Sequence, residues 1–215
     1  MKIEAVVFDM DGVLIDAKEW HYHALNRALE LFGYSISRAD HLTTFDGLPT
    51  SRKLEILSRE RELPRALHGF VNAMKQQYTV EQIHLHCKPV FTHEYTLSQL
   101  KAAGYKLGLA SNSIKSTVAL MMEKSRLSQY LDVMLSNQDV SHAKPHPEMY
   151  LKAAEALGTP PDRCLVVEDN EHGIKAAEAA GCQVLVVQSV LDVQLDRVLR
   201  AIARAEGAGT EARSR

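Results

Sequence analysis

Acidic, hydroxyl and amine side chains follow short apolar runs of the chain, at the places where strands would end. In an open parallel sheet, ligands bind beyond the carboxyl ends of the strands, so side chains at these positions converge. These residues are Asp9, Asp11, Ser111, Asn112, Lys144, Glu168 and Asp169. Each group alone is common in solvated turns, but the groups together, one after each of four successive strands, predict a single catalytic site.

Four carboxylates and one ammonium group predict chemistry on a phosphate. Carboxylates at close range raise one another's pKa from a free value of about 4 unless a cation compensates. Oxygen ligands suit Mg²⁺, which would let Asp9 approach a phosphate dianion and would stabilise charge on the transferring group. Lys144 would add positive charge, and the Ser111 hydroxyl would donate to a phosphoryl oxygen. Asp11 could protonate the leaving oxygen and then deprotonate the attacking water.

Short β-branched runs alternate with helical patterns over most of the chain. The runs predict strands at Ile3–Phe8, Lys106–Ala110, Asp132–Ser136, Cys164–Val167 and Val184–Val187. Helical patterns lie between them, at residues 93–103, 114–124, 147–157 and 173–180. The alternation predicts an α/β fold with a doubly wound parallel sheet, a Rossmann-like core.

Residues 17–86 break this alternation, because they contain helical patterns and no convincing strand. The patterns span Trp20–Leu31, Ser51–Glu60 and Phe70–Ile83. One crossover needs far fewer residues than this stretch contains. We therefore predict a small helical cap domain at 17–86, inserted into a catalytic core formed by residues 1–16 and 87–205. Residues 206–215 are small and polar, and we predict that they form a disordered tail.

Four segments resemble the signatures of the haloacid dehalogenase superfamily, in the branch with a helical cap after the first strand. They are VVFDMDGVLID, LASNS, AKPHPEMY and VVEDNEHGIKAAEAAG, and the match covers nearly the whole fold, residues 3–190. The resemblance implies a Mg²⁺-dependent phosphotransferase that works through an aspartyl-phosphate intermediate.

The resemblance also implies a role for each residue of the core. Asp9 is expected to be the nucleophile and Asp11 the general acid and base. Ser111 and Lys144 are expected to hold the phosphoryl group, with Asn112 beside them as a substrate-binding residue. The expected metal ligands are Asp9, the backbone carbonyl of Asp11, Asp169 and, at or just behind the metal, Glu168. The dehalogenases that attack carbon lack the second aspartate of the first signature, so the presence of Asp11 favours phosphate chemistry.

Within this superfamily the pattern is most similar to β-phosphoglucomutase and the small sugar-phosphate phosphatases. The mutase needs an arginine three residues after a cap-loop glycine, where this chain has Thr50 after Gly47, and Arg52 follows two residues later. Val80 stands where the mutase has a cap lysine. His21 matches a cap-hinge histidine of the mutase, or it is an ordinary histidine on a helix face. We expect Gly47, Thr50, Arg52 and His21 to contact the substrate.

These observations predict a phosphatase that hydrolyses a small phosphorylated metabolite, with a sugar phosphate as the leading candidate. One alternative is a phosphomutase of the β-phosphoglucomutase type. The other is a catalytically silent binding or regulatory protein on the same fold. The presence of Asp9, Asp11, Lys144 and Asp169 together argues against a silent protein.

Composition and charge limit the partners. The chain has 27 acidic and 25 basic residues, a formal charge of −2, which provides no electrostatic reason to expect nucleic acid or an anionic membrane as a partner. The apolar run near the N-terminus is short and ends in acids, so we expect neither a signal peptide nor a membrane span. Three cysteines without C-x-x-C spacing predict buried thiols in a reducing compartment. We expect a cytoplasmic protein that is a monomer or a weak dimer.

Four histidines outside the expected catalytic set invite the interpretation of a metal site. His84 and His86 are two residues apart in a helical pattern and would face different ways. His142 and His146 flank the Lys-Pro segment of the third signature. We expect all four to be surface or loop histidines and not metal ligands.

Overall fold

The computed structural model describes residues 2–211, with side chains as far as residue 207. The chain divides into two compact units. The core unit comprises the residues up to Asp16 together with those from Lys88 onward, and the helical unit is Ala17–Cys87. The division therefore runs within one residue of the limits of 17 and 86 expected from the sequence.

The core unit is built on a parallel sheet. Its strands among the described residues are β1 (Ala5–Phe8), β2 (Lys106–Ala110), β3 (Val133–Leu135), β4 (Cys164–Glu168) and β5 (Gln183–Val186). They lie in the order β3-β2-β1-β4-β5, and each neighbouring pair is parallel. The predicted α/β fold class is confirmed, and the strand ends differ from the prediction by at most two residues.

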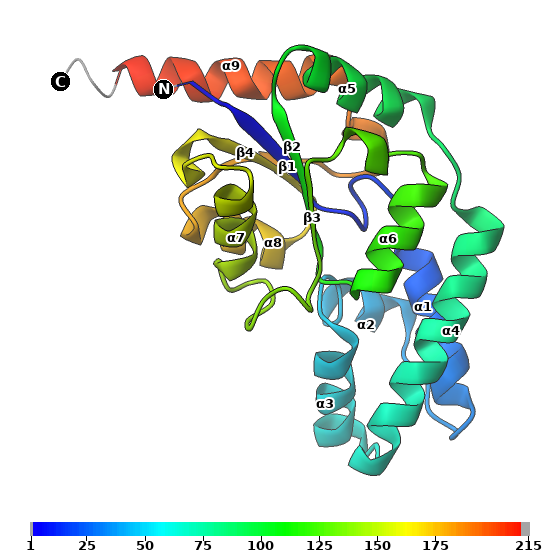
Figure 1. Ribbon diagram of the computed structural model, residues 1–215. Coiled ribbons are helices and arrows are strands. Elements are labelled where there is room, and N and C mark those ends of the chain that lie inside the picture. The colour runs from blue at the N-terminus through cyan, green and yellow to red at the C-terminus, as the bar shows by residue number, and fades with distance from the viewer. Residues whose placement is uncertain (1, 212–215) are drawn as a thin grey trace. The chain divides into compact units, whose positions relative to one another are not determined.

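Helices cover both faces of this sheet (Figure 1). They are α5 (Phe91–Ala102), α6 (Lys115–Lys124), α7 (Glu148–Ala156), α8 (Glu171–Ala179) and α9 (Leu195–Glu211). Because successive side chains of a strand point to opposite faces, Val7 of β1 and Val166 of β4 pack in one cluster with α7 and α8. The neighbouring Leu165 contributes to the opposite face, beside α9. Both faces of the sheet are therefore buried, as its uninterrupted apolar strands predict.

The strand register aligns the residues that follow the strands. Phe8 lies opposite Leu109 of β2 and Val167 of β4. Asp9 continues this pairing, since its N–H donates to the carbonyl of Val167 at 3.0 Å. The chain then turns sharply at Gly12, whose φ of 93° is a conformation that glycine adopts without steric cost.

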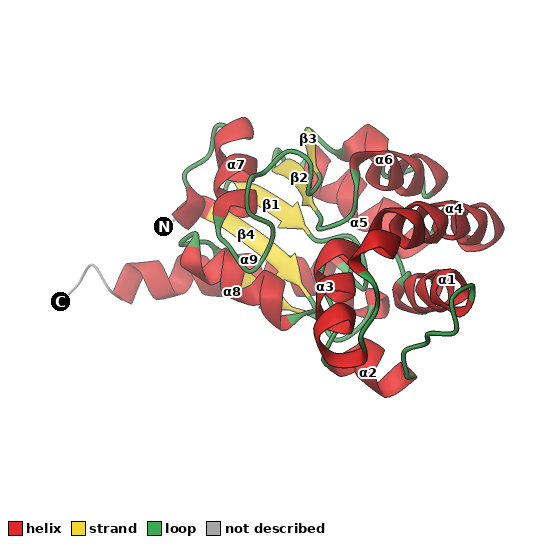
Figure 2. Cartoon of the chain, turned by 90° about the horizontal axis from the view of Figure 1, so that it is seen from below, coloured by secondary structure: helices red, strands yellow, loops and turns green. Residues whose placement is uncertain are grey.

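The helical unit consists of α1 (Lys18–Glu30), α2 (Arg38–Thr43), α3 (Thr50–Arg61) and α4 (His68–His86). In Figure 2 all of the strands, drawn in yellow, belong to the core unit. Helices α1 and α4 pack side by side along much of their length. The apolar side chains of Leu25, Leu29, Leu54 and Leu57 are buried in a hydrophobic cluster of this unit.

Among the α-helices of the described residues, α2 and α9 were not predicted from the sequence. Helix α2 begins with a capping box, in which the Ser37 hydroxyl accepts from the Asp40 N–H and the Asp40 carboxylate accepts from the Ser37 N–H. The prediction of a disordered tail from residue 206 was wrong for residues 206–211, because α9 continues to Glu211. Buried Val198 and Ile202 anchor this helix, and the Glu206 carboxylate accepts a hydrogen bond from the N–H of Ile3 at 3.0 Å. The remainder of the expected tail, residues 212–215, lies outside the described residues.

None of the helices within residues 2–211 is long and apolar enough to cross a membrane. The three cysteines, Cys87, Cys164 and Cys182, are free thiols and are buried.

Candidate active site

The carboxyl edge of the sheet brings together side chains from four segments of the core unit. Asp9 follows β1, Ser111 follows β2, and Glu168 and Asp169 stand at the end of β4. Lys144 belongs to the loop between β3 and α7. These are the positions at which an open parallel sheet binds its ligands.

The ammonium group of Lys144 is the centre of this group. Its Nζ donates to Asp9 Oδ1 at 2.7 Å, to Glu168 Oε1 at 2.6 Å and to the Ala110 carbonyl at 2.9 Å. The side chain is only 2% exposed. Burial alone would lower the pKa of Lys144, but the carboxylates of Asp9 and Glu168 outweigh it and raise the pKa above its ordinary value. Lys144 is therefore a permanent, fixed positive charge against the Asp9 carboxylate.

Glu168 is fully buried and holds Lys144 in place. Its Oε1 also accepts from the hydroxyl of Tyr150 at 2.6 Å, while Oε2 accepts from Asn170 Nδ2 at 3.0 Å and from the Asp169 N–H at 3.1 Å. Burial, and next the charge of Glu168, raises the pKa of Tyr150 well above its ordinary value, so the phenol stays a donor. Both carboxylate oxygens of Glu168 are thus engaged by protein donors, an arrangement suited to positioning Lys144.

Asp9 lies in a strongly acidic environment. Burial, and next the neighbouring charge of Glu168, raises the pKa of Asp9 well above its usual range, although Lys144 opposes this shift. Asp169 and Asp11 raise it further. An ionised Asp9 therefore requires more positive charge than Lys144 alone provides.

A divalent cation fits this requirement. Carboxylate oxygens of Asp9, Glu168 and Asp169 lie within 4.8 Å of one another. A set of oxygen donors from carboxylates is what Mg²⁺ prefers over softer ligands. Because each oxygen of Glu168 already accepts at least two hydrogen bonds from protein donors, Asp9 and Asp169 are better placed than Glu168 to contact the ion directly.

Asp11 is linked to the segment that follows β2. Ser113 Oγ donates to Asp11 Oδ2 at 3.0 Å, and the Ser113 N–H donates to Ser111 Oγ at 3.1 Å. The Ser111 hydroxyl is buried, with the residue 1% exposed. Ser113 was not among the predicted site residues, although it belongs to the LASNS signature that contains Ser111.

Asn112 contacts the backbone of the loop that carries Lys144. Its Oδ1 accepts from the Lys144 N–H at 3.1 Å, and its Nδ2 donates to the Lys144 carbonyl at 3.3 Å. The amide therefore braces the backbone on both sides of the Lys144 side chain. A direct contact of Asn112 with substrate stays a prediction.

Gly173 supports the site from helix α8 and was also not predicted. A Cβ added at this position would lie 1.7 Å from Glu168 Oε1 and 2.0 Å from Glu168 Cδ. The Gly173 N–H donates to Asn170 Oδ1, the N-cap of α8, at 3.0 Å. A glycine inside a helical pattern is a sequence signal for such a close approach, and this one stands in the fourth signature.

The other predicted substrate-binding residues belong to the helical unit. His21 lies on α1, with its Nδ1 3.3 Å from Lys75 Nζ. Gly47, with a φ of 68°, stands in the loop before α3, and Thr50 is the first residue of that helix. Arg52 lines a pocket of about 290 Å³ together with Glu55 and Arg65. Their roles in substrate binding stay predictions.

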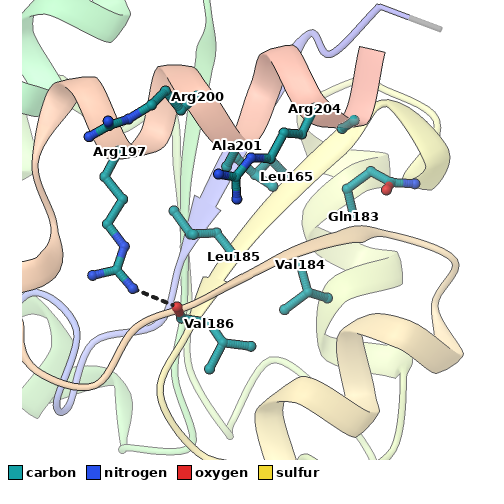
Figure 3. A pocket seen from close by; sticks show the side chains of 10 residues that line it. Leu165, Gln183, Val184, Leu185, Val186, Arg197, Arg200, Ala201 and Arg204 are labelled. Carbon is teal, nitrogen blue, oxygen red and sulfur yellow. Dashed lines mark hydrogen bonds between the residues drawn. The ribbon is translucent and has the colours of Figure 1, made fainter. Parts of the chain in front are cut away.

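The core unit also has a groove of about 650 Å³ between β5 and α9 (Figure 3). Leu185 lies on its floor, and Arg197, Arg200 and Arg204 extend from α9 along it. Arg197 Nη2 donates to the Val186 carbonyl at 3.2 Å, which covers an acceptor at the open edge of the sheet. The groove shares no lining residue with the acidic group at the strand ends, so it is not the candidate active site.

Comparison with known proteins agrees with the fold. The model of the haloacid dehalogenase-like hydrolase family matches residues 6–187. The pyrophosphatase PpaX of Bacillus mycoides is 30% identical over 203 residues, covering 89% of this chain and 86% of the relative. The phosphorylated carbohydrates phosphatase of Thermotoga maritima is 30% identical over 200 residues, covering 88% of each protein.

A solved structure supports the same fold. The crystal structure of β-phosphoglucomutase from Clostridium difficile has a TM-score of 0.81 to this chain, at 24% identity, and covers 94% of this chain and 98% of the mutase. The family match spans most of the chain and includes the site residues at the ends of β1, β2 and β4. The chain therefore belongs to the haloacid dehalogenase-like hydrolases, and its relatives place it among the phosphatases of that family.

Proposed function

We propose that the chain is a Mg²⁺-dependent phosphatase that hydrolyses a small phosphorylated metabolite through an aspartyl-phosphate on Asp9. The observation that supports this most directly is the contact of 2.7 Å between Lys144 Nζ and Asp9 Oδ1, inside a buried cluster of acids. A structural ion pair would need no further carboxylates, whereas Asp169 and Asp11 place two more acids beside Asp9, whose charge a bound cation would balance. Such charge concentrations are typical of catalytic sites.

The core residues can then divide the reaction into two displacements. The Asp9 carboxylate attacks phosphorus, the bond to the leaving oxygen breaks, and Asp11 gives its proton to that oxygen. Water then attacks the phosphorus of the aspartyl-phosphate, Asp11 takes the proton, and Asp9 leaves as a free carboxylate. Lys144 offsets the negative charge of the nucleophile, and Ser111 donates to a phosphoryl oxygen.

Asp9 and Asp169, with the Asp11 carbonyl, are the proposed Mg²⁺ ligands, and Glu168 stands behind them. The bound ion would neutralise carboxylate charge and polarise the phosphoryl oxygens. Asn112, Tyr150 and Glu168 would keep Lys144 in its orientation before the substrate arrives, since all three engage it or its partner. Such preorganised charge is usually the largest single contribution to catalysis.

We further propose that the substrate is a sugar phosphate and that the helical unit acts as the cap that selects it. The phosphorylated carbohydrates phosphatase of Thermotoga maritima supports the substrate class. The proposed selectivity residues are His21, Gly47, Thr50 and Arg52. A hydroxyl at Thr50 holds a second phosphate less strongly than a guanidinium would, which favours hydrolysis over mutase activity.

A screen of phosphorylated metabolites for release of inorganic phosphate tests the proposal. Wild-type protein with Mg²⁺ is compared with the same protein in EDTA and with Asp9→Asn, which keeps the size of the side chain and removes its charge. We expect release from one or more sugar phosphates and from p-nitrophenyl phosphate, with loss of both activities in EDTA and in the variant. Release that is equal in wild type and Asp9→Asn, or that is insensitive to EDTA, would contradict the proposal.

A further inference from the structure

Two histidines flank Lys144 in the sequence of the loop before α7. His142 precedes Lys144 by two residues, and His146 follows it by two. Glu148 is the first residue of α7. One ligand atom from each of His142, His146 and Glu148 lies within 4.8 Å of the other two. From this arrangement we propose that the three side chains form a second metal site, which binds a divalent transition-metal ion such as Zn²⁺.

The two imidazole rings and the carboxylate are already close together. The ring centroids of His142 and His146 are 4.7 Å apart. His142 Nδ1 lies 3.2 Å from Glu148 Oε2, and the Glu148 N–H lies 3.3 Å from His146 Nδ1. Both contacts lie at the long end of the range for hydrogen bonds. A metal ion bound by the two imidazoles and the carboxylate would replace these contacts.

The backbone fixes the carboxylate of this site. Glu148 Oε1 accepts from the Ser141 N–H at 2.8 Å, and Oε2 accepts from the His142 N–H at 2.9 Å. The loop that presents the histidines therefore also positions the third ligand. Lys152 Nζ lies 3.0 Å from Glu148 Oε1, but its side chain is 42% exposed and can turn toward solvent when a cation binds.

The ligand types distinguish this site from the acidic one. Two imidazoles and one carboxylate suit Zn²⁺ and its neighbours in the transition series, whereas Mg²⁺ prefers oxygen ligands alone. Three protein ligands leave a coordination position for water, as in open zinc sites. The His142 side chain is 67% exposed, so the ion can exchange with solvent.

The position of the site links it to the catalytic loop. A metal bound by His142, His146 and Glu148 would link the residues on both sides of Lys144 with each other. It would also link them with the first turn of α7. The same helix provides Tyr150, which donates to Glu168, the partner of Lys144. Occupancy would therefore stiffen the segment that holds the lysine.

Calorimetric titration with Zn²⁺ tests the proposal. Protein without a histidine tag is titrated in excess Mg²⁺, which occupies the acidic site, and wild type is compared with His142→Ala/His146→Ala. The matched control is His84→Ala/His86→Ala, which removes two exposed histidines from α4, two residues apart. We expect one site in wild type and in the control, and a Kd at least tenfold weaker in the loop variant, about 1.4 kcal/mol.

A spectroscopic measurement and two single variants complete the test of the metal site. Co²⁺ in place of Zn²⁺ should produce visible absorption bands of nitrogen ligation in wild type and the control, and these bands should be absent from the loop variant. The single variants His142→Gln and His146→Gln replace the double variant if it does not fold. Equal affinity for Zn²⁺ in wild type and folded loop variants, or no binding by wild type, would overturn the proposal and would leave the proposed phosphatase function unaffected.

Discussion

The substitution Gly173→Ala has two opposing effects: it raises the helix propensity of α8, and it introduces a clash with the Glu168 side chain. In an ordinary helix this change stabilises a protein by up to about 1 kcal/mol, because glycine is the weaker helix former. Gly173 is different, since an added Cβ would lie 1.7 Å from Glu168 Oε1, where ordinary contacts begin at 3.4 Å. The Glu168 carboxylate would have to retreat by about 1.7 Å, the difference between these two distances.

That displacement is too large for the hydrogen bonds of Glu168 to survive. Its bonds from Lys144 and Tyr150 are each 2.6 Å long. A hydrogen bond to a charged group contributes about 1.5–3 kcal/mol, so the loss of both costs about 3–6 kcal/mol. After the gain in helix propensity, we expect a net loss of about 2–5 kcal/mol of unfolding free energy and a large loss of turnover, because Lys144 is no longer held.

The assay must report on the core unit. The single tryptophan, Trp20, lies in the helical unit, so its fluorescence does not suffice. Hydrogen exchange of the β4 amides in increasing urea measures the core directly. The control is Gly207→Ala in α9 of the core unit, where an added Cβ meets nothing within 4 Å, and its effect should stay within about 1 kcal/mol. A Gly173→Ala protein as stable and as active as wild type would refute the reasoning.

Three further predictions concern the metal requirement, the pH dependence of stability and the product of the reaction. Asp169→Ala should raise the Mg²⁺ concentration needed for half-maximal activity, because one of few protein oxygens near the ion is lost; an unchanged Mg²⁺ requirement would contradict the assignment. Burial, and next the charge of Lys53, lowers the pKa of His41 in the helical unit to about 4. Between pH 7 and pH 5, His41 therefore takes up a proton in the unfolded chain but stays neutral in the folded protein. The free energy of unfolding should fall by about 2 kcal/mol over this range. Trp20 fluorescence during unfolding measures this, and an equal pH dependence in His41→Asn would be evidence against it. In phosphorus NMR of β-glucose 1-phosphate with a bisphosphate primer, we expect inorganic phosphate as the main product, because Thr50 replaces the arginine of the mutase; clean conversion to glucose 6-phosphate would identify a mutase.

The fold could be predicted from the sequence where local patterns decide it. Buried strands of a parallel sheet are continuous apolar runs, so β1, β2 and β4 were evident. Short or mostly polar helices have no such pattern. Helix α2 depends on a capping box at Ser37, and the last turns of α9 extend into a segment of small and polar residues that composition alone suggests is disordered.

The site could be predicted in outline, because every chemical group that ends a parallel strand must lie at the same edge. The convergence of Asp9, Glu168 and Lys144 follows from that rule. Tyr150 and Gly173 come from helices, and which face of a helix meets the site depends on packing that no spacing rule specifies. His142 and His146 were expected to be surface or loop histidines and not metal ligands. The contact between their rings depends on the turn around Glu148, which no sequence spacing specifies.

The central claim is that Asp9 carries the phosphoryl group during turnover, and chemical trapping tests it most directly. Protein is mixed with p-nitrophenyl phosphate and Mg²⁺, quenched in acid and treated with borohydride, which reduces an acyl phosphate of aspartate to homoserine. The variant Asp11→Asn should accumulate this species, because p-nitrophenolate leaves without a proton whereas the attacking water needs a base. We predict homoserine at position 9 in peptides from substrate-treated protein, and none without substrate or in Asp9→Asn. Release of phosphate by Asp11→Asn with residue 9 unmodified, or modification of a different residue, would contradict the account.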